Sequence, residues 1–315
     1  MAREKFLHEL SEHRILVEQL AVARKTRAQL IEKDYWLMHV LWGLQEQGFK
    51  FELKGGTSLS KGFGIIDRFS EDIDIRIEPP KELEVRGGVN HDKPSHIASR
   101  IKFYDWLTKE LSIPGVKAER DPSFDDKKGR SGAVRLNFES EYPTLAGVKS
   151  YVLLEVGFDV TKPNEKKTIS SWLYDAALTS GLTIVDNRAI DVACYLPGYT
   201  FVEKLQAIST KYAQEQEGKT MPVNFIRHYY DVYQLLGDQS VLSFIGTKPY
   251  FEHKATRFRT GDEPNIKKNE AFILSDRATR ARYAKEFQRT QALYYGGFPS
   301  FDAILSRIQE HGKKL

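Results

Sequence analysis

The sequence predicts an α+β fold in which helices flank a mixed β-sheet and the C-terminal half is helical. The first observation is the stretch DIDIRIE at 72–78, which alternates charged residues with isoleucine as a half-buried strand does. The second is the change in pattern near Ser170, after which apolar residues follow mostly helical spacing. We therefore expect two domains: residues 1–187 hold the N-terminal helices and the sheet, and residues 188–315 form a helical domain.

The elements before the alternating strand follow from local signals. Residues 3–47 have the apolar spacing of two helices, the second containing EKDYWLMHVLWGL and ending near Gly48. A short strand is expected at 51–54, followed by a double glycine. A helical turn should start at Thr57 or Ser58, since both residue types cap helices well.

The remaining elements follow the same rules. The stretch after residue 78 is rich in Pro, Gly and charge, which predicts an exposed loop. The later segments are a helix at 96–111, strands at 115–120, 133–139 and 150–159, a helix–loop–helix at 200–236, a polar loop at 252–270 and a basic helix at 275–293.

Composition excludes several classes of protein. The 315 residues are 41% hydrophobic, and no apolar run approaches the roughly 20 residues of a membrane span. The N-terminus lacks the apolar core of a secretory signal. The single cysteine, Cys194, excludes a disulfide framework and a cysteine-rich zinc cluster. We expect a cytoplasmic protein without membrane contact.

Positive charge is concentrated near the C-terminus. Residues 248–315 contain 14 Lys and Arg against 8 Asp and Glu, although the whole chain carries only +4. Such asymmetry indicates either an anionic partner or a solvated helix surface. The basic helix could contact an RNA backbone through phosphates. Its cationic residues are Arg277, Arg280, Arg282, Lys285 and Arg289.

Asp72 and Asp74 predict a metal site. Alternate residues of a strand point to the same side, so the two carboxylates converge. Two like charges so close are unfavourable unless a cation lies between them. Carboxylate oxygens suit Mg²⁺, which binds one or two carboxylates together with substrate phosphates. Two such ions can activate an attacking hydroxyl and stabilise a leaving pyrophosphate.

The stretch GGTS predicts a phosphate-binding turn. Gly55 and Gly56 allow close approach of the backbone, and the N–H groups that follow form an anion site at a helix start. The Thr57 and Ser58 hydroxyls can add hydrogen bonds. Neither a Walker A loop nor a Rossmann fingerprint is present. Alone, GGTS is typical of a plain turn and D-x-D of a solvated strand, but their order here is specific.

The stretch KGGTSLSKGFGIIDRFSEDIDI resembles the signature of the AbiEii/AbiGii toxin family. These proteins are nucleotidyltransferases of the DNA polymerase β-like superfamily, and the family includes the mycobacterial MenT toxins. The likeness extends from EKDYWL at 32–37 to the helices ending near residue 236. It implies that Gly55, Gly56, Thr57 and Ser58 hold a nucleoside triphosphate (NTP) and that Asp72 and Asp74 hold magnesium.

Many superfamily members carry a third metal-binding carboxylate on a later strand. The matching stretch here is YVLLEVGFD, in which Glu155 and Asp159 lie on one face. We favour Glu155 over Asp159. The alternative is that neither carboxylate touches metal.

The resemblance also implies a lysine and an aspartate on the helices after the core. Lys204 in FVEKLQAISTKY lies beside an apolar stripe and would bind nucleotide phosphates. Asp231 in FIRHYYDVYQLL would either orient Lys204 by an ion pair or accept a proton from the acceptor hydroxyl. The structural alternatives are a boundary lysine and a surface ion pair between Asp231 and Arg227.

Together these implications describe a toxin enzyme. It would use two Mg²⁺ ions to move a nucleoside monophosphate from an NTP to RNA, with a tRNA 3′ end as the expected acceptor and a cognate antitoxin as partner. The alternatives are nucleotidylation of a protein, including this one at Ser58 or another hydroxyl, and a non-catalytic nucleotide-binding module. The intact D-x-D speaks against the module. A nuclease or phosphatase would need a His/Asp metal cluster, which is missing from the sequence.

Overall fold

The computed structural model describes residues 4–88, 90–220, 222 and 225–315. Within the predicted segments, Arg3, Val89, Met221, Val223 and Asn224 lie outside the described residues. The chain divides into two compact units. The first contains the residues up to Gly62 and Phe69–Tyr195, and the second contains Phe63–Arg68 and Leu196–Leu315.

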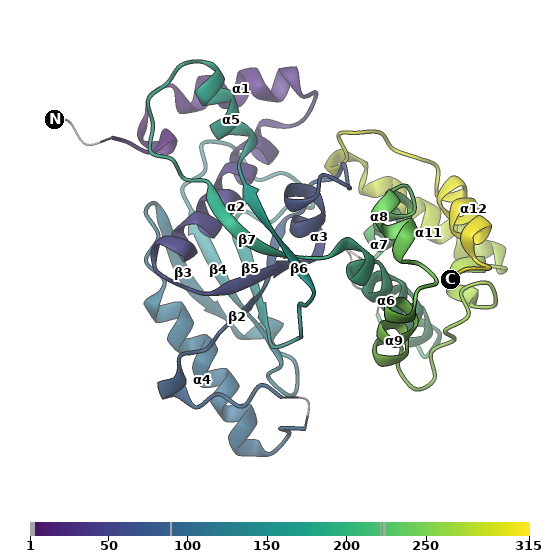
Figure 1. The fold of residues 1–315 in the computed structure, drawn as a ribbon. Coiled ribbons are helices and arrows are strands. Elements are labelled where there is room, and N and C mark those ends of the chain that lie inside the picture. The colour runs from purple at the N-terminus through teal and green to yellow at the C-terminus, as the bar shows by residue number, and fades with distance from the viewer. Residues whose placement is uncertain (1–3, 89, 221, 223–224) are drawn as a thin grey trace. The chain divides into compact units, whose positions relative to one another are not determined.

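A seven-stranded mixed sheet forms the centre of the first unit (Figure 1). The strand order is β3-β4-β5-β2-β1-β7-β6. Strand β2 is antiparallel to β1 and parallel to β5, and β7 is parallel to β1. The mixed sheet predicted from the sequence is therefore confirmed. The strands are β1 (Phe51–Lys54), β2 (Asp72–Ile77), β3 (Val116–Asp121), β4 (Ser131–Phe138), β5 (Val152–Gly157), β6 (Asn164–Ile169) and β7 (Ala189–Tyr195).

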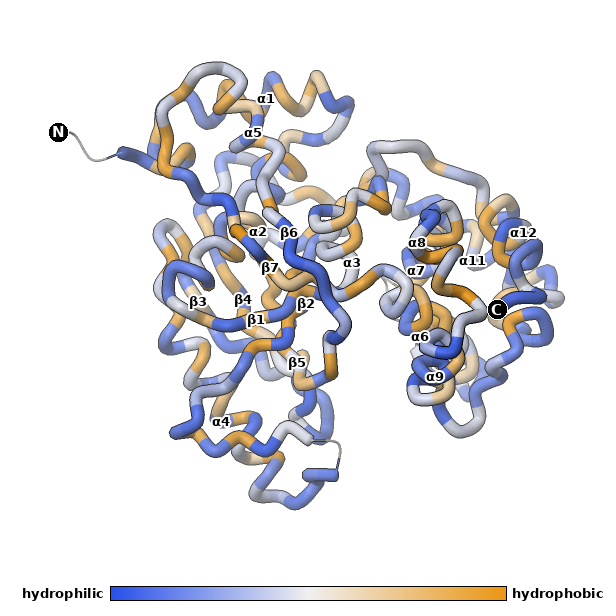
Figure 2. The backbone as a smooth tube through the Cα atoms, viewed as in Figure 1, coloured by the Kyte–Doolittle hydropathy of each residue, from blue (hydrophilic) through white to orange (hydrophobic). Residues whose placement is uncertain are grey.

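Strand β2 has the alternation that its sequence predicts. Ile73, Ile75 and Ile77 are completely or almost completely buried, while Asp72 and Asp74 on the other face are half-buried. Burial of an isoleucine stripe of this size contributes roughly 1.5–3 kcal/mol per side chain. The central strands carry hydrophobic residues in Figure 2, whereas the edge strand β6 is mostly hydrophilic.

Helices contact the sheet and one another within the first unit. Helix α2 contacts β5 and β7, and α4 contacts β3 and β4. Helices α1 and α5 contact each other and α2. The short α3 and the π-helical turn η2 follow β1 and carry the glycine turn. The bounds are α1 (His13–Ala23), α2 (Ala28–Glu46), α3 (Gly55–Thr57), η2 (Ser58–Gly62), α4 (Pro94–Glu110) and α5 (Trp172–Thr179).

The second unit is helical, as predicted for the C-terminal half. Helix α6 packs against α7, α8 and α9, and α12 packs against α7, α10 and α11. The segment 63–68 belongs here as well, since Arg68 forms a β-bridge with Tyr294. The helices are α6 (Pro197–Gln216), α7 (Arg227–Leu235), α8 (Gln239–Phe244), α9 (Lys248–Arg257), α10 (Glu270–Ile273), α11 (Arg277–Arg289) and α12 (Phe301–His311).

Some local predictions were wrong or incomplete. The polar loop expected at 252–270 begins later, because α9 continues to Arg257. The helix has its own start signals: the Thr247 hydroxyl accepts the Tyr250 N–H, and a proline occupies the first turn. Strands β6 and β7 had no sequence prediction. Within the described residues, no helix combines the length and the apolar character of a transmembrane segment.

Candidate active site

Three carboxylates meet on one face of the sheet in the first unit. Asp72 and Asp74 project from β2, and Glu155 is the cross-strand partner of Asp74 on the parallel strand β5. Burial and the neighbouring charges of Asp74 and Asp72 raise the pKa of Glu155 to about 8. Asp159 follows the end of β5, and its carboxylate lies 3.8 Å from Lys54 Nζ. The carboxylate that faces the aspartate pair from β5 is thus Glu155.

The glycine turn packs directly against the two aspartates. Gly55 has a left-handed backbone (φ +70°), and a Cβ at this position would lie 2.0 Å from Asp74 Oδ2. The buried Thr57 hydroxyl donates a hydrogen bond of 2.5 Å to the Asp72 carbonyl. Only glycine fits position 55, and Thr57 fixes the turn to the carboxylate strand.

The two hydroxyls of the turn are enclosed. Thr57 is 1% exposed and Ser58 is completely buried. The Ser58 side chain lies beside the buried thiol of Cys194. A buried hydroxyl is not accessible as an acceptor, so the geometry goes against Ser58 as a target of self-modification.

Lys149 is a residue of this cluster that the sequence prediction missed. Its ammonium lies 2.7 Å from Asp72 Oδ1, and its side chain is 23% exposed. Lys149 precedes β5, whereas Asp72 begins β2, so the contact spans 77 residues of sequence. No local sequence motif predicts a pair between Lys149 and Asp72.

The donor atoms are of the type that magnesium prefers, because all three carboxylates supply hard oxygen ligands. The pKa of Glu155 is raised first by burial and then by the charges of Asp74 and Asp72. In the described ranges, no group of three or more His, Cys, Asp or Glu side chains is placed so that these side chains alone could hold a metal ion. The ammonium of Lys149 instead contacts Asp72. Substrate phosphates would therefore have to complete the coordination.

Three consecutive charged residues inside α2 support this arrangement, and sequence reasoning gave them no role. Glu32, Lys33 and Asp34 are at most 2% exposed. The Lys33 ammonium donates to the Lys149 carbonyl at 2.8 Å. Asp34 pairs with Lys61 at 2.6 Å, which ties η2 to the helix. The available signal was the triplet EKD in an otherwise apolar helix, because buried charges occur where they are paired.

The second unit contains a separate buried cluster of charges. Lys204 Nζ on α6 lies 2.8 Å from Asp231 Oδ2 on α7. Arg68 binds the same carboxylate through both oxygens, Nε to Oδ1 at 2.6 Å and Nη2 to Oδ2 at 2.8 Å. Asp231 is completely buried and Lys204 is 7% exposed. Lys204 is therefore not a boundary lysine that extends to water, and Asp231 does not form a surface ion pair with Arg227.

The protonation states in this cluster follow from burial and charge. Burial alone would raise the pKa of Asp231, but Arg68 and Lys204 hold it well below the ordinary value. His228 Nδ1 lies 3.3 Å from Lys204 Nζ, and burial and Lys204 lower the histidine pKa well below its ordinary value. A neutral His228 can accept a hydrogen bond from Lys204.

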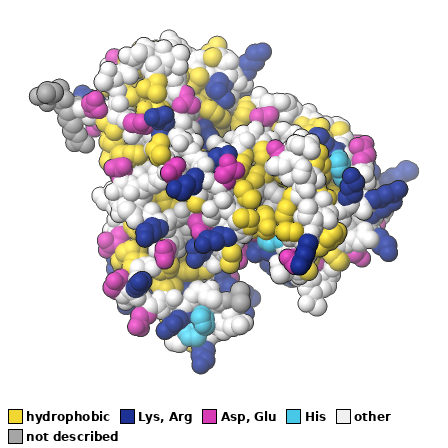
Figure 3. Space-filling model, in the orientation of Figure 1, with side chains coloured by type: hydrophobic (Ala, Val, Ile, Leu, Met, Phe, Trp, Pro, Cys, Tyr) yellow, Lys and Arg dark blue, Asp and Glu magenta, His cyan; other side chains and the backbone are white. Residues whose placement is uncertain are grey.

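The basic helix α11 is partly neutralised by its own unit. Arg280 pairs with Asp302, Arg282 with Glu215, and Arg289 with Glu286. Lys and Arg side chains nevertheless gather on the visible face of the C-terminal helices in Figure 3. RNA contact by α11 stays a prediction.

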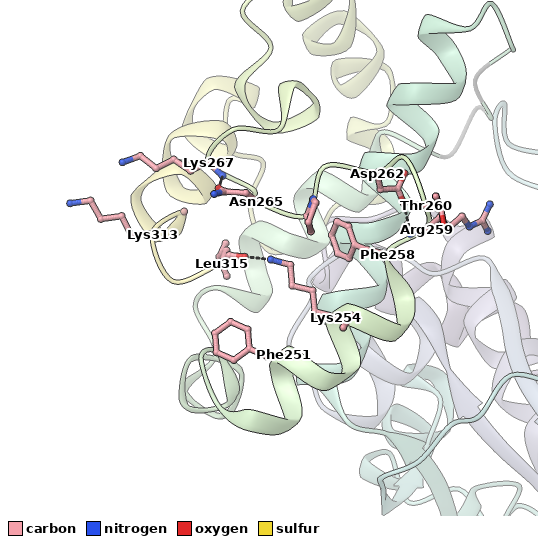
Figure 4. A pocket seen from close by; sticks show the side chains of 13 residues that line it. Phe251, Lys254, Phe258, Arg259, Thr260, Asp262, Asn265, Lys267, Lys313 and Leu315 are labelled. Carbon is pink, nitrogen blue, oxygen red and sulfur yellow. Dashed lines mark hydrogen bonds between the residues drawn. The ribbon is translucent and has the colours of Figure 1, made fainter.

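A cavity of about 990 Å³ also lies in the second unit, lined by α9, the segment after it and the last residues (Figure 4). Lys254 reaches into it and donates to the Leu315 carbonyl, while Lys267 and Lys313 extend away. Asp262 in its lining accepts hydrogen bonds from Thr210 Oγ1 and the Arg259 N–H. Among the described residues that line this cavity there is no pair of Asp or Glu side chains on which phosphoryl transfer would depend.

Two solved structures are similar to this chain. Among solved structures, the chain is similar to the nucleotidyltransferase toxin MenT4 of Mycobacterium tuberculosis, with 15% identity and a TM-score of 0.42 over 95% of this chain and 94% of that one. It is also similar to an antigenic nucleotidyltransferase-like protein of Paracoccidioides brasiliensis, with 12% identity and a TM-score of 0.39 over 81% of this chain and 93% of that one. No curated protein matches significantly.

The family comparison is more extensive. The sequence model described as "Nucleotidyl transferase AbiEii toxin, Type IV TA system" matches residues 39–307, which include every candidate residue named above from Gly55 to Asp231. This match implies an NTP substrate and a cognate antitoxin. The chain belongs to the AbiEii family of nucleotidyltransferase toxins of Type IV toxin–antitoxin systems.

Proposed function

We propose that this toxin transfers a nucleoside monophosphate from an NTP to RNA, with a tRNA 3′ end as the acceptor. In that reaction the acceptor hydroxyl oxygen bonds to the α-phosphorus and loses its proton to water, the bond from the α-phosphorus to the oxygen that bridges it to the β-phosphate breaks, and pyrophosphate leaves. The observation that carries the proposal is the meeting of Asp72, Asp74 and Glu155 beside the glycine turn. Metal-assisted in-line transfer needs carboxylates and a phosphate-binding turn in this proximity.

The carboxylates would hold two Mg²⁺ ions. Bound there, Mg²⁺ would neutralise charge on the triphosphate and make the acceptor hydroxyl a better nucleophile. The raised pKa of Glu155 supports the proposal, since burial and then the charges of Asp74 and Asp72 disfavour its ionised form, a cost that a bound cation would relieve. We assign the third ligand position to Glu155 because it lies opposite Asp74, whereas Asp159 faces Lys54.

The glycine turn would hold the triphosphate. The side chain of Thr57 is bonded to the Asp72 carbonyl, so we assign phosphate binding in Gly55–Ser58 chiefly to backbone N–H groups. Gly55 and Gly56 have no side chains to obstruct a ligand. This refines the sequence-based prediction, which gave the Thr57 and Ser58 hydroxyls a direct part.

For Lys204 we propose the role that the family resemblance implies, the binding of nucleotide phosphates. Asp231 would be a positioning residue that orients Lys204. Both oxygens of Asp231 are engaged by Arg68, and one also by Lys204, and its lowered pKa makes it a poor proton acceptor near neutral pH. These contacts support the orienting role over the general-base role.

Labelled nucleotides test the proposal. Purified protein is incubated with Mg²⁺, total tRNA and each α-³²P-labelled NTP in turn, beside Asp72→Asn. Asp191→Asn is the matched control, because Asp191 is an exposed aspartate of the same unit that pairs only loosely with Lys166. Label in the tRNA band with the wild type and the control, and its loss in Asp72→Asn, is the expected result.

Three other outcomes would contradict the proposal. Label in the protein band would indicate protein nucleotidylation. The absence of label in any band, with NTP binding retained in calorimetry, would indicate a nucleotide-binding module without catalysis. Equal labelling by Asp72→Asn and the wild type would remove the carboxylate cluster from the mechanism.

A further inference from the structure

Lys149 contacts the carboxylate cluster, with Nζ 2.7 Å from Asp72 Oδ1. We propose that Lys149 is a further residue of the nucleotide site: its ammonium occupies Asp72 until a divalent metal binds there, and then moves to the triphosphate. This inference rests on the proposed function, because it assigns a partner to the same carboxylates.

The backbone of Lys149 is clamped by two buried charged side chains. The Lys33 ammonium donates to the Lys149 carbonyl at 2.8 Å, and the Glu71 carboxylate accepts the Lys149 N–H at 3.2 Å. Lys33 and Glu71 also pair with each other at 3.8 Å, and their side chains are 3% and 2% exposed. Burying two charges is costly, and a surface lysine would not need such support. The clamp fixes where the Lys149 side chain begins.

The clamp also couples Lys149 to the metal-binding strand. Glu71 immediately precedes Asp72, so the residue that holds the Lys149 backbone is the neighbour of the residue that its ammonium binds. The Thr57 hydroxyl of the glycine turn is bonded to the carbonyl of the same Asp72. Asp72 is therefore a common contact of Lys149 and the glycine turn.

The charge of Lys149 suits an exchange between carboxylate and phosphate. A lysine ammonium is a compact charge on a flexible four-carbon stem, which can change partners without backbone movement. The pair with Asp72 is partly solvated, with side-chain exposures of 23% and 18%, so breaking it costs less than breaking a buried pair. A metal at Asp72 would displace the ammonium, and the adjacent turn is where the resemblance places phosphates.

Two opposite effects follow from this exchange. A lysine that competes with the metal weakens metal binding in the free protein, so removing its charge should strengthen it. A lysine that binds phosphate strengthens nucleotide binding once metal is present, so removing its charge should weaken it. If Lys149 merely neutralised charge on the surface, removing its charge would change metal binding without weakening nucleotide binding.

The test uses Lys149→Met, which removes the charge, and Lys149→Arg, which keeps it. Lys166→Met is the matched control, because Lys166 forms an exposed pair with Asp191 at 3.4 Å in the same unit. Mn²⁺ affinity is measured by electron paramagnetic resonance without nucleotide. The affinity of an α,β-methylene NTP analogue is then measured by calorimetry in saturating Mn²⁺, and thermal unfolding verifies that each variant is folded.

We expect Lys149→Met to bind Mn²⁺ several-fold more tightly and the analogue about 10-fold more weakly, the size of one charge-assisted contact. Lys149→Arg should resemble the wild type in both, and Lys166→Met should change neither. Unchanged Mn²⁺ affinity in Lys149→Met would overturn the inference, as would tighter Mn²⁺ binding with unchanged analogue affinity.

The Mn²⁺ affinities of the wild type, Asp72→Asn and Lys149→Met distinguish a failure of this inference from a failure of the proposed function. If Asp72→Asn binds Mn²⁺ as tightly as the wild type does, or if neither protein binds it, the metal site at Asp72 is refuted and both proposals fall. If the wild type binds Mn²⁺ through Asp72 and Lys149→Met behaves like the wild type, only the inference about Lys149 falls.

Discussion

Arg68 holds both carboxylate oxygens of Asp231, at 2.6 and 2.8 Å, although the two residues are 163 positions apart in sequence. The guanidinium provides the planar, two-pronged geometry that a carboxylate accepts best. The Lys204 ammonium binds the same aspartate at 2.8 Å, so one completely buried negative charge lies between two cations. Asp231 thus pairs with both Lys204, the lysine of the family motif, and Arg68, which comes shortly before Asp72 in the sequence.

Removing Arg68 should destabilise the protein strongly. Arg68→Ala would leave Asp231 buried with one cation fewer, and breaking a buried pair from one side costs about 3–5 kcal/mol. Arg280→Ala is the control, because Arg280 pairs with Asp302 at the surface and should cost less than about 1 kcal/mol. Urea unfolding measures both variants, and similar losses in the two would show that the Arg68 pair has no special weight.

Position 55 should accept only glycine. Gly55→Ala combines a left-handed backbone with a Cβ placed 2.0 Å from Asp74 Oδ2, so Asp74 must move and nucleotide transfer should fall. Gly181→Ala has a similar φ of +74° with no atom within 4 Å, and should cost only about 1–2 kcal/mol of stability. Overpacking at Gly55 should add about 1–3 kcal/mol to that loss. Transfer assays and thermal unfolding of the pair test this prediction, and normal transfer by Gly55→Ala would contradict it.

Glu155→Gln and Asp159→Asn should separate the two candidates for the third metal ligand. We expect Glu155→Gln to reduce nucleotide transfer by about 100-fold, the upper end of the losses that follow when a residue supporting a metal site is changed, and Asp159→Asn to have little effect. The reverse result would transfer the ligand role to Asp159.

The same glutamate should produce a pH dependence of stability in metal-free protein. The pKa of Glu155 is about 8 in the folded chain and 4.5 in the unfolded one, so between these values the folded state binds more protons. Stability should therefore fall as pH rises from about 4.5 to 8. Glu155→Gln removes this contribution, and urea unfolding in EDTA should show its advantage over the wild type growing across that window. A constant difference between the two would contradict the raised pKa.

A buried histidine of α2 should make the first unit sensitive to acid. Asn187 donates to His39 Nδ1 and His39 Nε2 donates to the Pro114 carbonyl, both at 3.0 Å, so the ring is neutral. Burial lowers the pKa of His39 to about 4. The unfolded chain then binds the extra proton first, and stability should fall as pH drops from 6.5 to about 4. Nuclear magnetic resonance of the His39 ring should show no titration above pH 5, and a midpoint near 6.5 would refute the prediction.

Sequence alone predicted those parts of the site that are encoded locally. The alternation of β2 placed Asp72 and Asp74 on one face, and the apolar stripes of α6 and α7 placed Lys204 and Asp231 near buried surfaces. These signals have periods of two or about 3.6 residues, so a short stretch of chain reveals them.

The remaining contacts depend on residues that are distant in sequence. Lys149 reaches Asp72 across 77 positions, and nothing in its neighbourhood marks it. Strand β6, NEKKTI, is too polar to be predicted as a strand, and it forms through pairing with β7 at the sheet edge. Buried ion pairs and edge strands are decided by tertiary partners, which local patterns do not contain.

The six residues of 63–68 make the two compact units unsuitable for separation by a single cut. A fragment that ends at residue 195 would keep Arg68 and lose Asp231, and a fragment that begins at 196 would keep Asp231 and Lys204 and lose the guanidinium. The first fragment would lose the carboxylate that binds Arg68, and the second would keep Asp231 with Lys204 as its remaining cation. Cutting this toxin between residues 195 and 196 should therefore yield two insoluble or partly folded fragments. Either fragment should fold only when both are expressed together.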